Sequence, residues 1–80
     1  MTLVELTEMI VKSLVSDPDS ISVKEFPGDD EIIIEVVVKE EDMGSVIGRE
    51  GKIANSIRTV VQASSYLKDN KRVKINISSF

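Results

Sequence analysis

The sequence predicts an α+β fold whose elements run helix, strand, strand, helix, helix, strand. Residues 3–15 carry apolar side chains at helical spacing, which is typical of an amphipathic helix. Residues 31–39 are rich in β-branched side chains, which favours a strand. Two glycines, Gly48 and Gly51, separate a short helical pattern from a long one, so we expect a tight loop between two helices.

The first helix has a start signal and a stop signal. Thr2 and Glu5 have the spacing of a capping box, in which each side chain binds the backbone amide of the other residue. Asp17 is expected to end the helix, because a residue before proline disfavours helical geometry. The apolar positions of this helix are Leu3, Leu6, Ile10 and Leu14, with Val4 and Val11 beside them.

A hairpin is predicted after the first helix. A short strand at 21–25 and a long strand at 31–39 flank Pro27-Gly28-Asp29-Asp30, which is a turn signal. One face of the long strand is expected in the core, and its members are Ile32, Ile34, Val36 and Val38. The other face carries Ile33, Glu35 and Val37, which suggests partial cover or a place beside a binding groove.

The second half of the chain predicts two helices and a final strand. A short helix at 42–47 follows the acidic cluster Glu40-Glu41-Asp42, whose expected role is N-capping and compensation of the helix dipole rather than metal binding. Ile47 is expected in the small core, so that asparagine there would damage the fold. A long helix is expected over 52–67, and residues 73–77 alternate as a half-buried strand.

The long helix has an apolar arc about 180° wide, more than the ~100° that a surface helix needs to meet its own core. Along the middle of the arc lie Ile53, Ile57, Val60 and Ser64, and its flanks are Ala54, Val61, Ala63 and Leu67. The excess width predicts contact with a second copy of the chain, and the alternative is deeper burial inside the domain. The expected residues of a dimer interface are Ala54, Ile57, Arg58 and Val61.

Composition argues against most catalytic and metal chemistry. The 80 residues predict one domain, 1–80, and they include no Cys and no His. The usual proton carrier, the thiol nucleophile and the commonest metal ligand are therefore missing, so we expect no enzyme, no catalytic residue, no cofactor and no metal. No apolar run is long enough for a membrane span or a signal peptide, and the expected location is cytoplasmic.

Charge is distributed unevenly along the chain. Residues 1–42 carry three lysines and twelve acids, a net of −9, and residues 43–80 carry seven basic residues and two acids, a net of +5; the sum is the total of −4. The glycine loop therefore lies in the basic half, as expected for contact with a polyanion. A solvated surface of mixed charge is the alternative.

The glycine loop predicts an anion site. Its backbone amides would lie at the start of the long helix, where the helix dipole favours an anion, and Arg49 and Lys52 add positive charge. A phosphate chain is the simplest ligand. The Walker A pattern and the dinucleotide fingerprint would both require glycine at Val46, so nucleotide hydrolysis and dinucleotide binding are excluded. A helical corner that uses glycine only for tight packing is the alternative.

The element order, together with Val46-Ile47-Gly48-Arg49-Glu50-Gly51-Lys52-Ile53 at the helix junction, resembles the KH domain in its type II topology. The resemblance covers the whole chain and implies three helices on one face of a three-stranded mixed sheet. It also implies that the G-x-x-G loop, residues 48–51, clamps about four nucleotides of single-stranded RNA, with the bases in an apolar groove. The candidate RNA-binding residues are Val46, Ile47, Gly48, Arg49, Glu50, Gly51, Lys52, Ile53, Ile57 and Arg58.

The resemblance also implies partners and a cellular role. Small bacterial proteins of this kind form homodimers and pair with a larger KH-containing RNA-binding protein of the Jag family. RNA-chaperone activity, post-transcriptional regulation and control of cell division, cell shape and cell wall biogenesis are attributed to them. Glu50 departs from the pattern, because many members carry a basic or neutral residue there. Two other interpretations stay open: a protein-interaction adaptor that dimerises through the long helix, and a ribosome-associated assembly factor.

Overall fold

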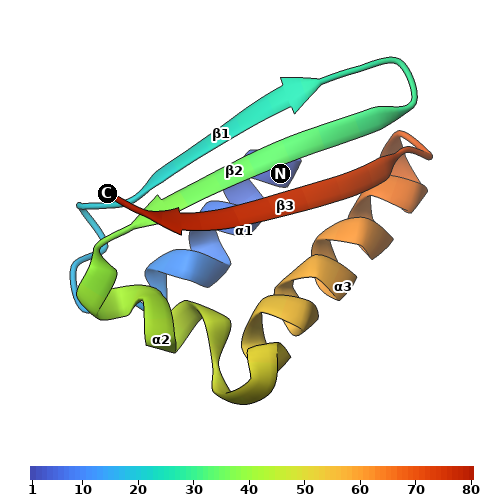
Figure 1. Ribbon diagram of the computed structural model, residues 1–80. Coiled ribbons are helices and arrows are strands. Elements are labelled where there is room, and N and C mark those ends of the chain that lie inside the picture. Colours follow the sequence, from blue (N-terminus) through green and yellow to red (C-terminus); the bar gives the residue numbers. More distant parts are fainter.

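The structure, a computed structural model, describes residues 1–80, and its helices all lie on one face of a three-stranded sheet (Figure 1). The helices are α1 (Leu3–Lys12), α2 (Met43–Ile47) and α3 (Lys52–Lys68), and the strands are β1 (Ser22–Pro27), β2 (Glu31–Val38) and β3 (Arg72–Ser79). Short 3-10 turns, η1 (Glu40–Asp42) and η2 (Arg49–Gly51), precede α2 and α3. This arrangement confirms the predicted α+β fold with a mixed sheet.

β2 is the central strand of the sheet. β1 pairs with it antiparallel through the predicted hairpin, and β3 pairs with it parallel. The Gly28 amide closes the hairpin turn by donating to the Glu31 carbonyl at 2.8 Å. β1 extends to Pro27, past the expected end at residue 25, and an edge strand tolerates a proline there. β3 is likewise longer than the expected 73–77.

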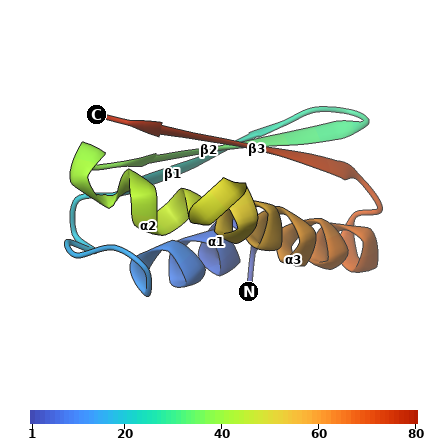
Figure 2. The same cartoon turned by 60° about the horizontal axis from the view of Figure 1, so that its bottom comes forward.

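The core lies between the sheet and the helices (Figure 2). The inner face of β2 is buried as predicted, since Ile32, Ile34, Val36 and Val38 are each at most 3% exposed. The helices and β3 complete this core with Leu3, Val11, Val46, Ile57, Val61 and Ile75. No helix covers the opposite face of the sheet, where Ile33 and Val37 are half-buried (Figure 2).

α1 begins where the sequence predicts and ends earlier. Thr2 Oγ1 accepts from the Glu5 amide at 3.1 Å and Glu5 Oε1 accepts from the Thr2 amide at 2.8 Å, so the capping box is formed. The helix ends at Lys12 instead of residue 15. The Ser13 hydroxyl donates to the Ile10 carbonyl at 2.6 Å, and such a local bond competes with the helical pattern. The chain therefore leaves the helix before it reaches the proline.

α3 has the predicted length but a different buried stripe. The buried side chains of α3 are Ala54, Ile57, Val61 and Ser65. Val61 is fully buried while Val60 is 48% exposed, so the helix is turned away from the expected line through Val60 and Ser64. Ser65 tolerates burial because its hydroxyl donates to the Lys71 carbonyl at 2.8 Å. The flank left outside carries Val60, Ala63 and Leu67.

Candidate nucleic-acid interface

The glycine loop is a sharp turn between α2 and α3 (Figure 1). Gly48 adopts φ 74° and ψ 175°, and Gly51 adopts φ 75° and ψ 13°. Glu50, between them, is also left-handed, with φ 58° and ψ 23°. The Gly51 amide donates to the Gly48 carbonyl at 3.2 Å and closes the turn. Three of the four loop residues thus have a backbone that L side chains rarely adopt.

The two glycines are needed for different reasons. A Cβ on Gly48 would lie 2.6 Å from Ile53 Cγ1, closer than real side chains approach, and its φ is positive as well. A Cβ on Gly51 would meet no atom within 4 Å, so only its positive φ favours glycine. Gly48 therefore lets the loop pack directly on the first turn of α3, while Gly51 leaves open space beside the start of that helix.

The N-terminus of α3 has no side-chain cap. Gly51 occupies the capping position, where a Ser, Thr, Asn or Asp would bind the first amides. The first turn of the helix also contains no acidic residue. Uncapped amides and the dipole of a 17-residue helix together favour an anion at this end. The Lys52 amide already donates to the Arg49 carbonyl, so the amides that follow it in the first turn are the candidate donors to a phosphate group.

The basic side chains of the loop are free of ion pairs. Arg49 and Lys52 are exposed, and both ion pairs in the structure involve Lys39 on the other side of α2. Glu50 is exposed too and has no basic partner. Two cations and one anion therefore surround the helix start, and the cations are available to an anionic ligand.

The apolar candidates divide into core and surface. Val46 is 0% exposed and Ile57 is 3% exposed, so these two predicted RNA-binding side chains pack in the core of the domain. Ile47 and Ile53 are half-buried beside the loop. The expectation that Ile47 belongs to the core is wrong, because Val46 fills that place and Ile47 does not pack in the core cluster. An asparagine at Ile47 would therefore lie at a half-buried position outside the core cluster.

Three residues expected at a dimer interface are buried in their own domain. Ala54, Ile57 and Val61 are 2%, 3% and 0% exposed, so their side chains have almost no surface to offer a second copy. The outer apolar surface lies instead between α1 and α3. A hollow of about 440 Å³ opens there, and it is lined largely by apolar side chains that include Met9 and Val60.

Arg58, the last predicted site residue, binds the edge of β3. Its Nε and Nη2 donate to the Ile75 carbonyl at 3.4 and 3.3 Å, and its Nη1 donates to Asn55 Oδ1 at 3.2 Å. Gln62 continues this contact, because its amide nitrogen donates to the Lys71 carbonyl at 2.9 Å. This contact of Gln62 was not predicted from the sequence. The available signal was a set of polar residues at 58, 62 and 65, which lie about one helical turn apart beside the buried stripe.

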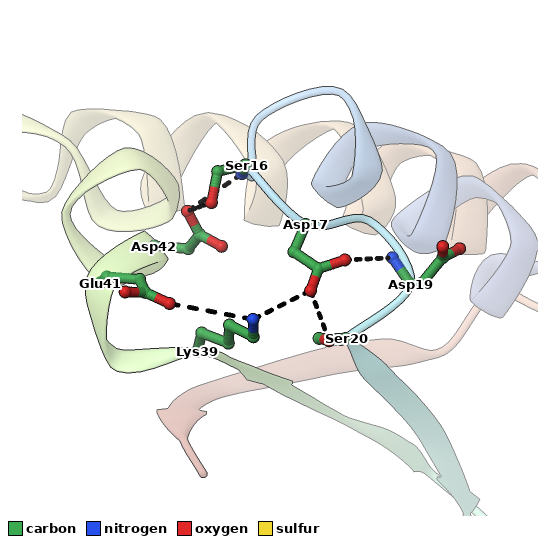
Figure 3. Close-up of polar contacts among 7 residues, drawn as sticks. All are labelled: Ser16, Asp17, Asp19, Ser20, Lys39, Glu41 and Asp42. Carbon is green, nitrogen blue, oxygen red and sulfur yellow. Dashed lines mark hydrogen bonds and ion pairs between the residues drawn. The ribbon is translucent and has the colours of Figure 1, made fainter.

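The acidic cluster does not cap α2 with its side chains. Figure 3 shows the Asp42 carboxylate turned to Ser16. Asp42 Oδ1 instead accepts from the Ser16 amide at 3.0 Å and from the Ser16 hydroxyl at 2.8 Å. These donors lower the pKa of the Asp42 carboxyl from its ordinary value. The expectation of side-chain capping is therefore wrong, because the Asp42 carboxylate binds Ser16 in the loop after α1. The three acids do lie in the first turn of η1, where the dipole favours negative charge. The bond between Asp42 and Ser16 fixes the start of α2 and so positions the helix that leads into the glycine loop.

An ion pair supports the same junction (Figure 3). Lys39 Nζ lies 2.9 Å from Asp17 Oδ2 and 3.9 Å from Glu41 Oε1. The Lys39 ammonium, and then the Ser20 hydroxyl, lower the pKa of the Asp17 carboxyl. The same contact with Asp17 raises the pKa of Lys39. The carboxylates here bind one lysine and two serines, and no group of three lies close enough to hold a metal ion.

Comparison with known proteins places this fold and loop in a family. The family model described as KhpA/KhpB, KH domain, matches residues 4–77. The chain belongs to the KhpA/KhpB KH-domain family. It is 51% identical over 73 residues to the RNA-binding protein KhpA of Clostridium perfringens, covering 91% of this chain and 96% of that protein. KhpA of Borreliella burgdorferi is 42% identical over 74 residues, covering 92% of this chain and 89% of that protein.

Solved structures of Era have the same fold as this KhpA-like chain. One is a complex of Era with MgGDPNP and nucleotides 1506–1542 of 16S ribosomal RNA, with a TM-score of 0.67 and 23% identity over 96% of this chain and 29% of Era. Another, Aquifex aeolicus Era with bound GDP and aluminium fluoride, has a TM-score of 0.69 and 22% identity over 98% of this chain and 30% of Era. At these identities the likeness shows the fold alone. No helix here is long and apolar enough to cross a membrane.

Proposed function

We propose that the chain binds single-stranded RNA through its G-x-x-G loop, and that it is not an enzyme. The observation that carries the proposal is the uncapped start of α3, which has two positive-φ glycines before it and two unpaired cations beside it. Phosphates would contact the backbone amides, Arg49 and Lys52. Bases would lie on the half-buried side chains Ile47 and Ile53. The relatives named as RNA-binding proteins support the same conclusion.

Binding of this kind is weak and depends on salt. The loop can contact only a few phosphates. For single strands, the slope of log affinity against log salt concentration is roughly −0.7 for each phosphate contacted. Glu50 opposes a phosphate at the same place, although its side chain is exposed and can turn outward. The proposal is therefore of a low-affinity module that contacts the RNA backbone with little base preference.

The test is a fluorescence-anisotropy titration of single-stranded RNA at low salt. It compares the wild-type chain with a double variant, Arg49→Asp and Glu50→Asp. Aspartate tolerates the left-handed conformation of Glu50, so the fold should be kept, and circular dichroism checks it. We expect the variant to lose binding because the charge at Arg49 is reversed. Equal binding by a folded variant would remove the loop from the site.

A homodimer is the second part of the proposal, and it is also what an adaptor function would need. The supporting observation is the apolar hollow between α1 and α3, with Met9 53% and Val60 48% exposed on it and Leu67 88% exposed farther along α3. Analytical ultracentrifugation of Val60→Asp tests it, with Thr59→Asp as a control of equal charge on the next residue. A dimer through this surface predicts that only Val60→Asp becomes monomeric. Val61→Asp is unsuitable, because Val61 is fully buried and the change would unfold the domain.

The wider role follows from the family resemblance. We propose a heteromer with a Jag-family KH protein, RNA-chaperone or post-transcriptional regulatory activity in the cytoplasm, and a link to cell division, cell shape and cell wall growth. A ribosome-associated assembly factor would use the same loop chemistry. Co-purification of tagged wild-type chain and the loop double variant distinguishes RNA-dependent partners from direct ones, since only RNA-dependent partners should be lost with the variant.

A further inference from the structure

Met9, on α1, borders two depressions of different character. The first is the apolar hollow of about 440 Å³ between α1 and α3. The second has a volume of about 400 Å³, and its other lining residues are all charged: Glu5, Glu8 and Lys12. Each helical residue turns by about 100°, which places the apolar and the charged neighbours on opposite sides of Met9 along α1. Because Met9 is 53% exposed, solvent reaches a side chain that borders both surfaces.

Met9 carries the only sulfur atom in the apolar hollow. The chain contains three Met and no Cys, so thioethers are its only sulfur groups. Met43 is half-buried and packs against the core, and Met1 does not line the hollow. Exposed thioethers are oxidised to sulfoxides, and the change disrupts apolar interfaces that contain them. Sulfur oxidation can therefore change the character of the hollow only at Met9.

Hydrogen peroxide supplies the oxygen for this reaction. A lone pair of Met9 Sδ attacks one peroxide oxygen, the S–O bond forms, the O–O bond breaks, and the second oxygen leaves as water. The sulfur loses two electrons, the peroxide gains them, and the product is methionine sulfoxide. Its oxygen accepts hydrogen bonds, so burial of the sulfoxide against apolar side chains costs free energy. A methionine sulfoxide reductase with a dithiol as electron donor restores the thioether.

The charged depression gives the oxidised side chain a polar place outside the hollow. Lys12 lies three residues after Met9, so the two side chains are neighbours on the surface of α1. The Lys12 ammonium is exposed, takes part in neither ion pair of the structure, and can donate to a sulfoxide oxygen. We propose that Met9 is a redox-sensitive modification site, at which oxidation by hydrogen peroxide weakens the contact of the hollow with a second copy of the chain. The proposal rests on the proposed homodimer through this hollow.

The test measures the dimer dissociation constant before and after peroxide treatment. Sedimentation velocity over a range of protein concentrations gives the constant, and peptide mass spectrometry counts the oxygen atoms on each methionine. Oxidation of the wild type should raise the constant by about 5- to 150-fold, the effect of one polar group buried without a partner. Met9→Leu keeps Met1 and Met43 but cannot be oxidised in the hollow, so its constant should change by less than about twofold on treatment. The reductase should restore the wild-type constant.

Several outcomes would overturn the modification site. An unchanged constant with Met9 fully oxidised would do so, as would an equal loss in treated Met9→Leu or a loss that the reductase does not reverse. A second measurement uses the cover that a second copy gives the hollow: oxidation of Met9 relative to Met1 should slow as the protein concentration rises through the dissociation constant. A ratio independent of concentration would place Met9 outside the interface. If the untreated wild type is monomeric throughout, the homodimer proposal fails and the modification site fails with it; if it dimerises but does not respond to peroxide, only the modification site fails.

Discussion

Alanine at each of the three glycines around the loop should have three different effects. Gly44 lies in α2, where a Cβ would meet no atom within 4 Å and the φ is negative. Gly51 has the same open space and a φ of +75°. Gly48 has a φ of +74°, and its Cβ would lie 2.6 to 2.9 Å from three atoms of the Ile53 side chain. The series therefore separates helix propensity, backbone strain and steric overlap.

The magnitudes follow from these differences. Gly44→Ala should raise the free energy of unfolding by about 0.5–1 kcal/mol, because alanine is the better helix former. Gly51→Ala should lower it by about 1–2 kcal/mol, the cost of the left-handed conformation for a residue with a Cβ. Gly48→Ala adds an overlap cost of about 1–3 kcal/mol and should lower it by about 2–5 kcal/mol in total. The free energy of unfolding of a domain of this size is only about 4–12 kcal/mol.

Thermal and urea unfolding followed by circular dichroism measure these differences. Each kcal/mol moves the melting temperature of so small a domain by about 4–8 °C, so the three variants should be well resolved. The order of stability should be Gly44→Ala, wild type, Gly51→Ala and then Gly48→Ala. Equal melting temperatures for Gly48→Ala and Gly51→Ala would refute the packing of Gly48 against Ile53. A stable Gly51→Ala variant would refute the left-handed loop.

The remaining predictions concern the core, the α2 junction and the loop charge. Ile34→Val should cost about 0.5–1.5 kcal/mol in urea unfolding, and Ile33→Val on the open face should cost less, because Ile34 is fully buried; equal costs would contradict the assigned faces. Asp42→Asn should lower stability at neutral pH. Folding lowers the pKa of Asp42, so the extra stability of the wild type is full above the ordinary pKa of 3.8 and is lost as pH falls through the folded pKa. A difference in urea midpoint between wild type and variant that does not change with pH would show that the ionised Asp42 carboxylate is not its source. Glu50→Asn should raise RNA affinity in anisotropy titrations, since it removes the opposing charge and asparagine suits the left-handed backbone; unchanged affinity would mean that Glu50 points away from the RNA.

The fold could be predicted because its signals are local. The capping box of α1, the turn signal of the hairpin and the alternation in β2 each depend on residues close in sequence, and each is confirmed. The end of α1 was missed by three residues, because the Ser13 hydroxyl bond that accompanies it has no strong sequence signal. The G-x-x-G spacing located the loop, since positive φ at Gly48 and Gly51 is a property of glycine itself.

The details of the site depended on contacts between distant segments. Val46 and Ile47 are adjacent apolar residues, and only the packing of α2 on the sheet decides that Val46 is buried. The buried stripe of α3 was expected to pass through Val60 and Ser64, but it passes through Val61 and Ser65, where the Ser65 hydroxyl donates to the Lys71 carbonyl. Asp42 was expected to cap its own helix and binds the loop after α1, 26 residues away. Such long-range hydrogen bonds leave no periodic pattern to read.

The most direct test of the central claim is a map of RNA contacts on the folded chain. An NMR titration of ¹⁵N-labelled protein with a short single-stranded RNA follows every backbone amide at once. RNA binding by the uncapped start of α3 predicts that the largest shifts fall on residues 48–53 and that they fade as salt is raised. The largest shifts on the α1–α3 hollow, or no shifts in the loop at a saturating RNA concentration, would contradict the account.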